Sequence, residues 1–209
     1  MNSGAAAAVS HYDSAPDLFG ARYASGRFED IHSNLLRYLP RTGAAVLDVG
    51  AGIGRDAAAL AERGYAVTAV EPSLGLQRWG REHYATGGIR WIADHLPRLV
   101  SLNAEVGTFE FILCSAVLIH LAPNQIDDSF ITLARLLQSG GKLGVSVRHA
   151  IASDLPGVFF DHPEKALIAA AKKAKLEVID REQSEDALGR PDVKWRSLVL
   201  EKPVAPADG

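Results

Sequence analysis

The sequence has 209 residues, of which 47% are apolar, and 22 basic and 25 acidic side chains give it a formal net charge of -3. This length suits one α/β domain, and the balanced charge favours neither a nucleic-acid nor a membrane partner. The single cysteine excludes an internal disulfide framework and a thiolate-cluster metal site, and no apolar run approaches the roughly 20 residues that span a bilayer. We expect a cytoplasmic protein without a bound metal.

Residues 1–10 are small and polar, and we expect them to be disordered. Residues 12–40 predict a helical segment outside the sheet that carries Tyr12, Arg22 and Arg27. Apolar side chains recur there at spacings of three and four, as one helical face requires: Phe28, Ile31, Leu35 and Leu39. This segment has two interpretations, a lid over a ligand site or a helix packed on the sheet with its arginines in water.

The most informative stretch begins with an apolar strand at residues 46–49, which runs into alternating glycines and then a helix over residues 55–63. A second strand, residues 66–70, ends on the acidic residue Glu71. This strand-turn-helix-strand-acid unit is typical of sites that hold an adenosine-containing cofactor. Glycine allows positive φ and a close backbone approach to a ligand, and Glu71 is placed to accept hydrogen bonds from both ribose hydroxyls.

The remaining elements follow in chain order. We predict helices over residues 74–84, 96–106, 123–138 and 164–175, and strands over residues 89–93, 109–114 and 142–147. Residues 176–181 and 195–202 also read as strands, with no amphipathic helix between them to carry a parallel crossover. They therefore predict an antiparallel hairpin at the edge of an otherwise parallel sheet, within one domain over residues 1–209.

Two cofactor classes compete for the glycine loop. Gly52, Gly54 and Ala57 satisfy the pattern of an NAD(P)-dependent or flavin oxidoreductase. Asp48 favours the alternative of S-adenosylmethionine, because a carboxylate attracts a sulfonium and repels a pyrophosphate. A structural interpretation of Asp48 is that it caps amides of the following loop.

Residues 46–73, VLDVGAGIGRDAAALAERGYAVTAVEPS, resemble the cofactor-binding core of class I S-adenosylmethionine-dependent methyltransferases of the small-molecule type. Residues 91–94, 111–121 and 137–143 resemble the later motifs of that family in the expected order. The resemblance covers about residues 12–202. It implies a Rossmann-like three-layer α/β sandwich, with a mostly parallel seven-stranded sheet and an antiparallel C-terminal strand.

The resemblance also implies roles for individual residues. It puts Asp48, Gly50 and Gly52 around the methionine portion of the cofactor, Glu71 on the ribose, Asp94 on the adenine and the backbone of Cys114 beside the methionine end. As a plain turn residue Asp94 would be unremarkable. Neighbours of these positions and the N-terminal segment complete the candidate cofactor-binding set: Ala51, Arg55, Pro72, His95, Tyr12, Arg22 and Arg27.

Motifs that the sequence lacks restrict the class of molecule that could accept the methyl group. No Asn/Asp-Pro-Pro-aromatic step follows the fourth strand, no Pro-Cys nucleophile is present, and no basic stripe appears, so we expect a small-molecule acceptor with an O, N or S nucleophile. His120 and His149 follow the fourth and fifth strands and are candidate general bases. The alternative interpretation is that His120 packs against or caps the next helix and that His149 is a solvated loop residue. Alignment of the two reactants would then be enough for catalysis without a base. A catalytically silent cofactor-binding regulatory protein also fits, and the oligomeric state is left open.

Overall fold

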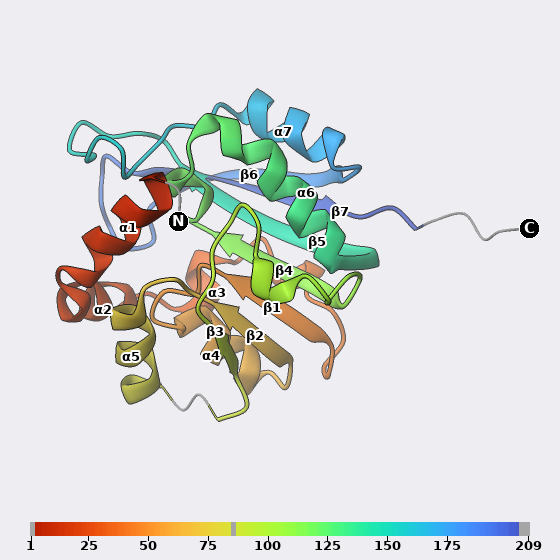
Figure 1. Ribbon diagram of the computed structural model, residues 1–209, viewed down its shortest axis with the longest axis horizontal. Helices are drawn as coiled ribbons and strands as arrows, with labels where there is room; N and C mark the ends of the chain where they lie inside the picture. The colour runs from red at the N-terminus through yellow and green to blue at the C-terminus, as the bar shows by residue number, and fades with distance from the viewer. Residues whose placement is uncertain (1–2, 85–86, 205–209) are drawn as a thin grey trace, which may run out of the picture.

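The computed structural model describes residues 3–84 and 87–204, which form one seven-stranded sheet in the order β3-β2-β1-β4-β5-β7-β6 (Figure 1). The strands are β1 (Ala45–Val49), β2 (Ala66–Val70), β3 (Arg90–Ile92), β4 (Phe109–Ser115), β5 (Leu137–Arg148), β6 (Glu177–Glu185) and β7 (Lys194–Glu201). Strand β7 is antiparallel to both of its neighbours, and the other adjacent strands are parallel. The predicted sheet with a reversed last strand is confirmed, and β6 runs in the common direction.

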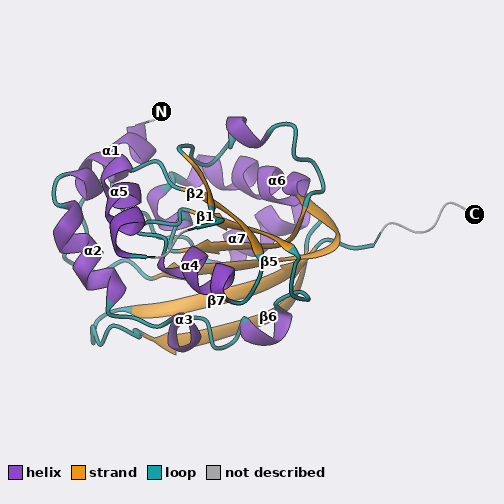
Figure 2. Ribbon diagram, turned by 90° about the horizontal axis from the view of Figure 1, so that it is seen from below, coloured by secondary structure: helices purple, strands orange, loops and turns teal. Residues whose placement is uncertain are grey.

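Helices cover both faces of this sheet, which makes the three layers (Figure 2). They are α1 (Ser3–Asp13), α2 (Pro16–Ala24), α3 (Phe28–Ile31), α4 (Arg55–Glu62), α5 (Leu74–His83), α6 (Ile126–Leu136) and α7 (Glu164–Lys173). Alternate residues of β1 belong to different cores: Leu47 packs with α6 and α7, and Val46 packs with α3 and α4. This alternation is what a strand buried on both faces requires.

The expected disorder of residues 1–10 is wrong for residues 3–10, which belong to α1; residues 1–2 lie outside the described part of the chain. Alanine has the highest helix propensity, and Ala5 and Ala8, three residues apart, are buried. The helical segment predicted for residues 12–40 is divided into several short helices. Pro16 begins α2, and Ser25 caps its C-terminal end.

Residues 96–106 do not form the predicted helix; they contain a single 3₁₀ turn, Val100–Leu102. Pro97 has no amide proton to donate, and Leu99 has a φ of 46°, which a right-handed helix does not allow. Leu96, Leu99 and Leu102 still pack against the sheet. The spacing of these apolar residues therefore indicated which side chains are buried, and did not indicate a helix. The α6 boundary also differs, because the helix ends at Leu136 and β5 begins at Leu137.

The glycine loop after β1 lies directly against α5. A Cβ atom added to Gly80 would overlap the carbonyl oxygen of Ile53, which belongs to this loop. Glycine at position 80 therefore sets how closely α5 approaches the loop.

We predict that Gly80→Ala lowers the free energy of unfolding by about 1–3 kcal/mol, because the new methyl group meets a backbone atom that moves only with the loop. Alanine gains about 1 kcal/mol of helix propensity, which offsets part of this cost. Urea denaturation measures the difference. Gly87→Ala is the control, since a Cβ there meets nothing within 4 Å. Equal stability of the two variants would refute the close packing.

Candidate functional site

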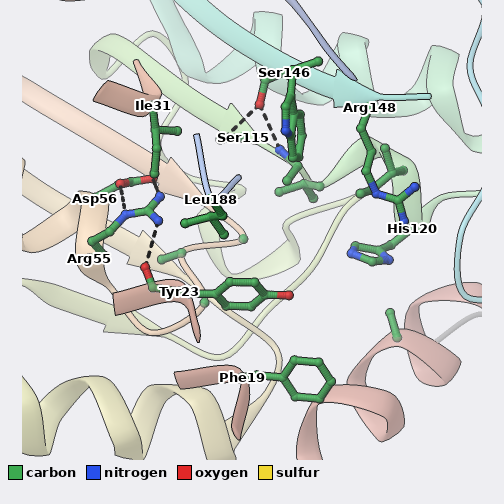
Figure 3. A pocket seen from close by; sticks show the side chains of 18 of the residues that line it. Phe19, Tyr23, Ile31, Arg55, Asp56, Ser115, His120, Ser146, Arg148 and Leu188 are labelled. Atoms are coloured by element: carbon green, nitrogen blue, oxygen red, sulfur yellow. Dashed lines mark hydrogen bonds and ion pairs between the residues drawn. The ribbon is translucent and has the colours of Figure 1, made fainter. Parts of the chain in front are cut away.

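A cavity of about 630 Å³ opens at the carboxyl ends of the parallel strands, within the usual size range for small-molecule sites (Figure 3). The loops after β1, β2, β3, β4 and β5 line it. Helices α1 and α2, here called the lid helices, and the β6–β7 connection also line it. Figure 3 shows labelled side chains from α2, from β4 and the loop after it, from β5 and from the β6–β7 connection around one space.

The glycine loop supplies a bare stretch of cavity wall. Gly50 and Gly52 have φ values of 69° and 56°, which glycine adopts readily. A Cβ atom at Gly50 would overlap Val117, whereas one at Gly52 would meet no atom within 4 Å. Backbone at Gly52 is thus open to close approach by a ligand, and Ala51 lines the cavity beside it.

Glu71 is held in the cavity wall by two backbone amides. Its Oε2 accepts from Gly52 N–H at 2.8 Å and its Oε1 accepts from Ser73 N–H at 2.8 Å. The residue is 6% exposed, and burial raises the pKa of its carboxyl to about 7 although both hydrogen bonds oppose the shift. The carboxylate is therefore fixed in orientation, with lone pairs left for a ligand hydroxyl.

Asp48 lies behind the glycine loop and does not line the cavity. It is buried, and among the described residues its Oδ2 has no hydrogen-bond partner. Burial, and then the charge of Asp56, raises the pKa of its carboxyl, while the Ala57 amide at the start of α4 partly offsets this. This position agrees with the capping interpretation, and the cofactor contact of Asp48 stays a prediction.

Arg55 connects α4 to the lid helices. Its guanidinium donates to both carboxylate oxygens of Asp56 at 2.7 and 2.9 Å, and to the carbonyl oxygen of Tyr23 at 3.1 Å (Figure 3). His32 Nε2 lies 2.9 Å from the same carboxylate. Burial opposes ionisation of Asp56, but the charges of His32 and Arg55 outweigh it and hold its pKa well below the usual range. Arg55 lines the cavity, and three of its five N–H donors are used in these bonds within the protein.

The residues after β3 also reach the cavity. Asp94 accepts the backbone amides of His95 and Ser101, each at 2.7 Å, so it is a turn residue that still lines the cavity. The Nδ1 atom of His95 lies 2.7 Å from the carbonyl oxygen of Leu96. Pro72 lines the wall between this turn and Glu71. Contacts of these residues with a cofactor stay predictions.

His120 is half-buried in the cavity wall, and its two nitrogens have different partners. Nδ1 lies 2.9 Å from the carbonyl oxygen of Val158, which can accept but not donate, so we place the ring proton on Nδ1. Nε2 then accepts from the hydroxyl of Tyr12 at 3.0 Å. Burial lowers the pKa of His120 to about 4, which keeps the ring neutral at physiological pH.

Other predicted site residues fall in different places. Arg22 lines the cavity, whereas the Arg27 side chain is 75% exposed, lies outside the cavity and pairs with Glu29 at 3.7 Å. His149 is exposed, does not line the cavity, and lies 2.9 Å from Arg196. Cys114 is fully buried and burial raises the pKa of its thiol; the residues that follow it, rather than Cys114 itself, line the cavity.

The β6–β7 connection is a part of the wall that the sequence interpretation missed. Leu188 reaches into the cavity (Figure 3). Asp186 fixes the connection by accepting from Arg190 at 2.7 Å and from Trp195 Nε1 at 2.8 Å. The sequence did hold a signal for this: a reversed last strand turns back at the carboxyl edge of the sheet. Three aromatic side chains from the lid and from the loop after β5 also line the cavity: Phe19, Tyr23 and Phe159.

Comparison with known proteins shows which family the central part of the chain resembles. The family model described as a methyltransferase domain matches residues 46–141. The similarity to a methyltransferase domain thus spans somewhat less than half of the chain. The sheet order, with β7 inserted in reverse, also differs from the parallel dinucleotide-binding order that the oxidoreductase interpretation required. The expected family is confirmed over the matched residues.

A curated relative supports this assignment. The chain is similar to the ubiquinone biosynthesis O-methyltransferase of Xylella fastidiosa (strain 9a5c), with 37% identity over 110 residues. That match covers 52% of this chain and 43% of the relative, so the chain matches less than half the length of that protein.

Solved structures share the fold at low sequence identity. The 1,6-didemethyltoxoflavin-N1-methyltransferase of Burkholderia thailandensis has a TM-score of 0.67 and 23% identity, covering 95% of this chain and 87% of its own. The cyclase SpnF has a TM-score of 0.72 and 16% identity, covering 94% and 95%. One of these proteins is named as a cyclase, so the shared fold alone does not decide the activity. The side chains of the site distinguish one reaction from another.

Two of the groups with shifted pKa values, Glu71 and His120, predict opposite pH dependences. Folding raises the pKa of Glu71 from 4.5 to about 7, so the stability that this group contributes is present at low pH and is lost as pH rises. Folding lowers the pKa of His120 from 6.5 to about 4, so its contribution is present at high pH and is lost as pH falls. Between about pH 5 and 6 the two slopes nearly cancel.

We therefore predict that His120→Asn makes the free energy of unfolding fall, and Glu71→Gln makes it rise, with increasing pH in this window, relative to the unaltered protein. Each slope is at most about 1.4 kcal/mol per pH unit, which corresponds to one proton. Urea denaturation at several pH values measures both, and carboxylates common to the three proteins cancel in the differences. Parallel curves for all three proteins would contradict the shifts.

Proposed function

We propose that the chain is an enzyme that transfers a methyl group from S-adenosylmethionine to a small-molecule acceptor. The observation that carries this proposal is the Glu71 carboxylate, held by the amides of Gly52 and Ser73 at the edge of a bare glycine loop. A fixed carboxylate beside open backbone suits a ribose with two neighbouring hydroxyls. The match of this segment to a methyltransferase domain supports the same cofactor class.

The residues present fit this cofactor. Glu71 would accept from the ribose, the glycine loop at Gly50 and Gly52 would pass close to the methionine portion, and Asp94 and His95 would lie toward the adenine. The cofactor supplies a methyl group activated on a sulfonium. The protein's part is to align the acceptor with that methyl group and to exclude water.

The enclosure of the cavity favours a small acceptor. The lid helices line one side of the cavity and the β6–β7 connection lines another. The space between them therefore suits a small molecule better than an extended polymer. Tyr12 bonds to His120 and Asp13 accepts from Ser73 Oγ at 2.5 Å, which fastens the lid at two points. None of the described helices is long and apolar enough to cross a membrane. The relative named as an O-methyltransferase supports oxygen as the acceptor atom.

Calorimetric titration with S-adenosylmethionine, S-adenosylhomocysteine and NAD tests the cofactor class. We expect the first two to bind and NAD to give no heat. Glu71→Ala should weaken S-adenosylhomocysteine binding about 10- to 100-fold, because hydrogen bonds to a charged acceptor are lost. Glu62→Ala, which removes an exposed carboxylate from α4, is the control and should leave binding unchanged. Binding of NAD instead would overturn the proposed function.

The same titration predicts a pH effect. The pKa of Glu71 is about 7 without ligand, and a ribose bonds better to the ionised carboxylate, so S-adenosylhomocysteine affinity should fall below that pH. The loss of affinity approaches tenfold per pH unit if ligand binding releases one proton from Glu71. Glu71→Gln should remove this dependence, and a dependence that persists in the variant would assign the effect to another group.

A further inference from the structure

The lid helix α1 and the loop after β4 meet in one partly buried hydrogen bond, from the Tyr12 hydroxyl to His120 Nε2 at 3.0 Å. The two residues are 108 positions apart in the chain, and both line the cavity. Since the other nitrogen of His120 donates to Val158, Nε2 is the proton-accepting atom of the ring. The Tyr12 oxygen donates its own proton and keeps lone pairs that can accept another.

Aromatic rings surround this hydrogen bond. Phe19 lies 5.0 Å and Tyr23 6.3 Å from the Tyr12 ring, centre to centre, and Phe159 lies 4.9 Å from His120. Figure 3 shows the Tyr23 ring reaching into the cavity and Phe19 beside it. A cavity lined by aromatic rings favours a ligand that itself has an aromatic or conjugated ring, which can stack on these rings or lie edge-on to them.

The charged groups nearest the pair are largely bound to one another. Arg148 donates to both oxygens of Asp154, at 2.8 and 2.5 Å, and stacks on Phe159 at 4.6 Å. The donors of Arg148 that bind Asp154 are not available to an acceptor carboxylate. His11 also faces His120, and Tyr23, Glu71 and Arg190 face Tyr12. A neutral ring with a hydroxyl group suits these surroundings better than an anion.

We infer that Tyr12 and His120 form a proton relay and that the acceptor is a planar hydroxylated ring, a phenol or a related enol. This inference rests on the proposed methyl transfer. As the acceptor oxygen bonds to the methyl carbon, the carbon–sulfur bond breaks and its electron pair stays on sulfur. The acceptor proton passes to Tyr12 Oη, and the Tyr12 proton passes to His120 Nε2.

Charge balance explains how a neutral, half-buried histidine can act in this way. The reaction removes one positive charge from sulfur and creates one on the imidazole, so the net charge enclosed in the cavity does not change. An isolated imidazolium would be costly in this partly buried position, but here it replaces a charge that was already present. Tyr12 is thus assigned as a catalytic residue in addition to forming part of the lid.

The test uses S-adenosylmethionine with nitrocatechol, catechol and methylcatechol, which run from strongly to weakly acidic hydroxyls, and measures release of S-adenosylhomocysteine. His120→Asn keeps a donor for Val158 but lacks the Nε2 acceptor, and Tyr12→Phe keeps the ring but lacks the hydroxyl. Both should lower the rate with methylcatechol about 10²- to 10⁴-fold, the usual range for proton-transfer catalysis. Nitrocatechol, which is largely ionised at slightly alkaline pH, should lose less than about tenfold.

Asp13→Asn is the matched control because it weakens the other lid fastening, to Ser73 and Gly75, without touching His120. It should lower all three rates by the same factor. If Tyr12→Phe and His120→Asn also lower all three rates equally, Tyr12 and His120 are structural and the relay is wrong. If the protein binds S-adenosylmethionine but methylates none of the catechols, the acceptor class is wrong while the proposed function stands. Failure to bind S-adenosylmethionine in calorimetry would overturn both.

Discussion

The carboxylate of Glu71 joins the parts of the site that the rest of the structure brings together. It accepts one amide from the glycine loop after β1 and one from Ser73 at the start of α5, and Ser73 in turn donates to Asp13 at the end of α1. Two sheet loops and the lid are therefore organised around one buried negative charge. Burial makes this charge costly, and the same desolvation strengthens each hydrogen bond that it accepts. The glycines allow this arrangement because a side chain at Gly50 would collide with Val117.

The reversed strand β7 shapes the other half of the cavity. It lies between β5 and β6 and begins at the carboxyl edge of the sheet, so the connection from β6 must cross that edge. Leu188 reaches the cavity for this reason, and Asp186 holds the connection to Arg190 and Trp195. A parallel last strand would have started at the opposite edge and left this side open. One strand direction thus supplies a wall of the acceptor region.

Ion pairs inside the protein determine what kind of ligand the cavity suits. Three arginines at its wall bind carboxylates of the same chain: Arg55 binds Asp56, Arg148 binds Asp154, and Arg190 binds Asp186. Recognition is left mainly to shape, aromatic rings and hydrogen bonds, together with the carboxylate of Glu71. Proteins that share the fold at 16–23% identity are named for different reactions, so these side chains rather than the sheet distinguish one activity from another.

The sheet, the glycine loop and Glu71 could be predicted from the sequence, because apolar strands and a turn that requires glycine show in the identity of adjacent residues. The sequence also indicated the reversed strand, from the absence of a crossover helix. Three features became visible only in the folded chain: Asp48 lies behind the loop, His149 is exposed, and Tyr12 meets His120 across 108 positions. The pattern of residues 96–106 shows the same limit, since three buried leucines predicted a helix that Pro97 and the φ of Leu99 do not allow. Local periodicity records which residues are buried, whereas contacts between distant segments depend on how the chain returns to the same edge of the sheet.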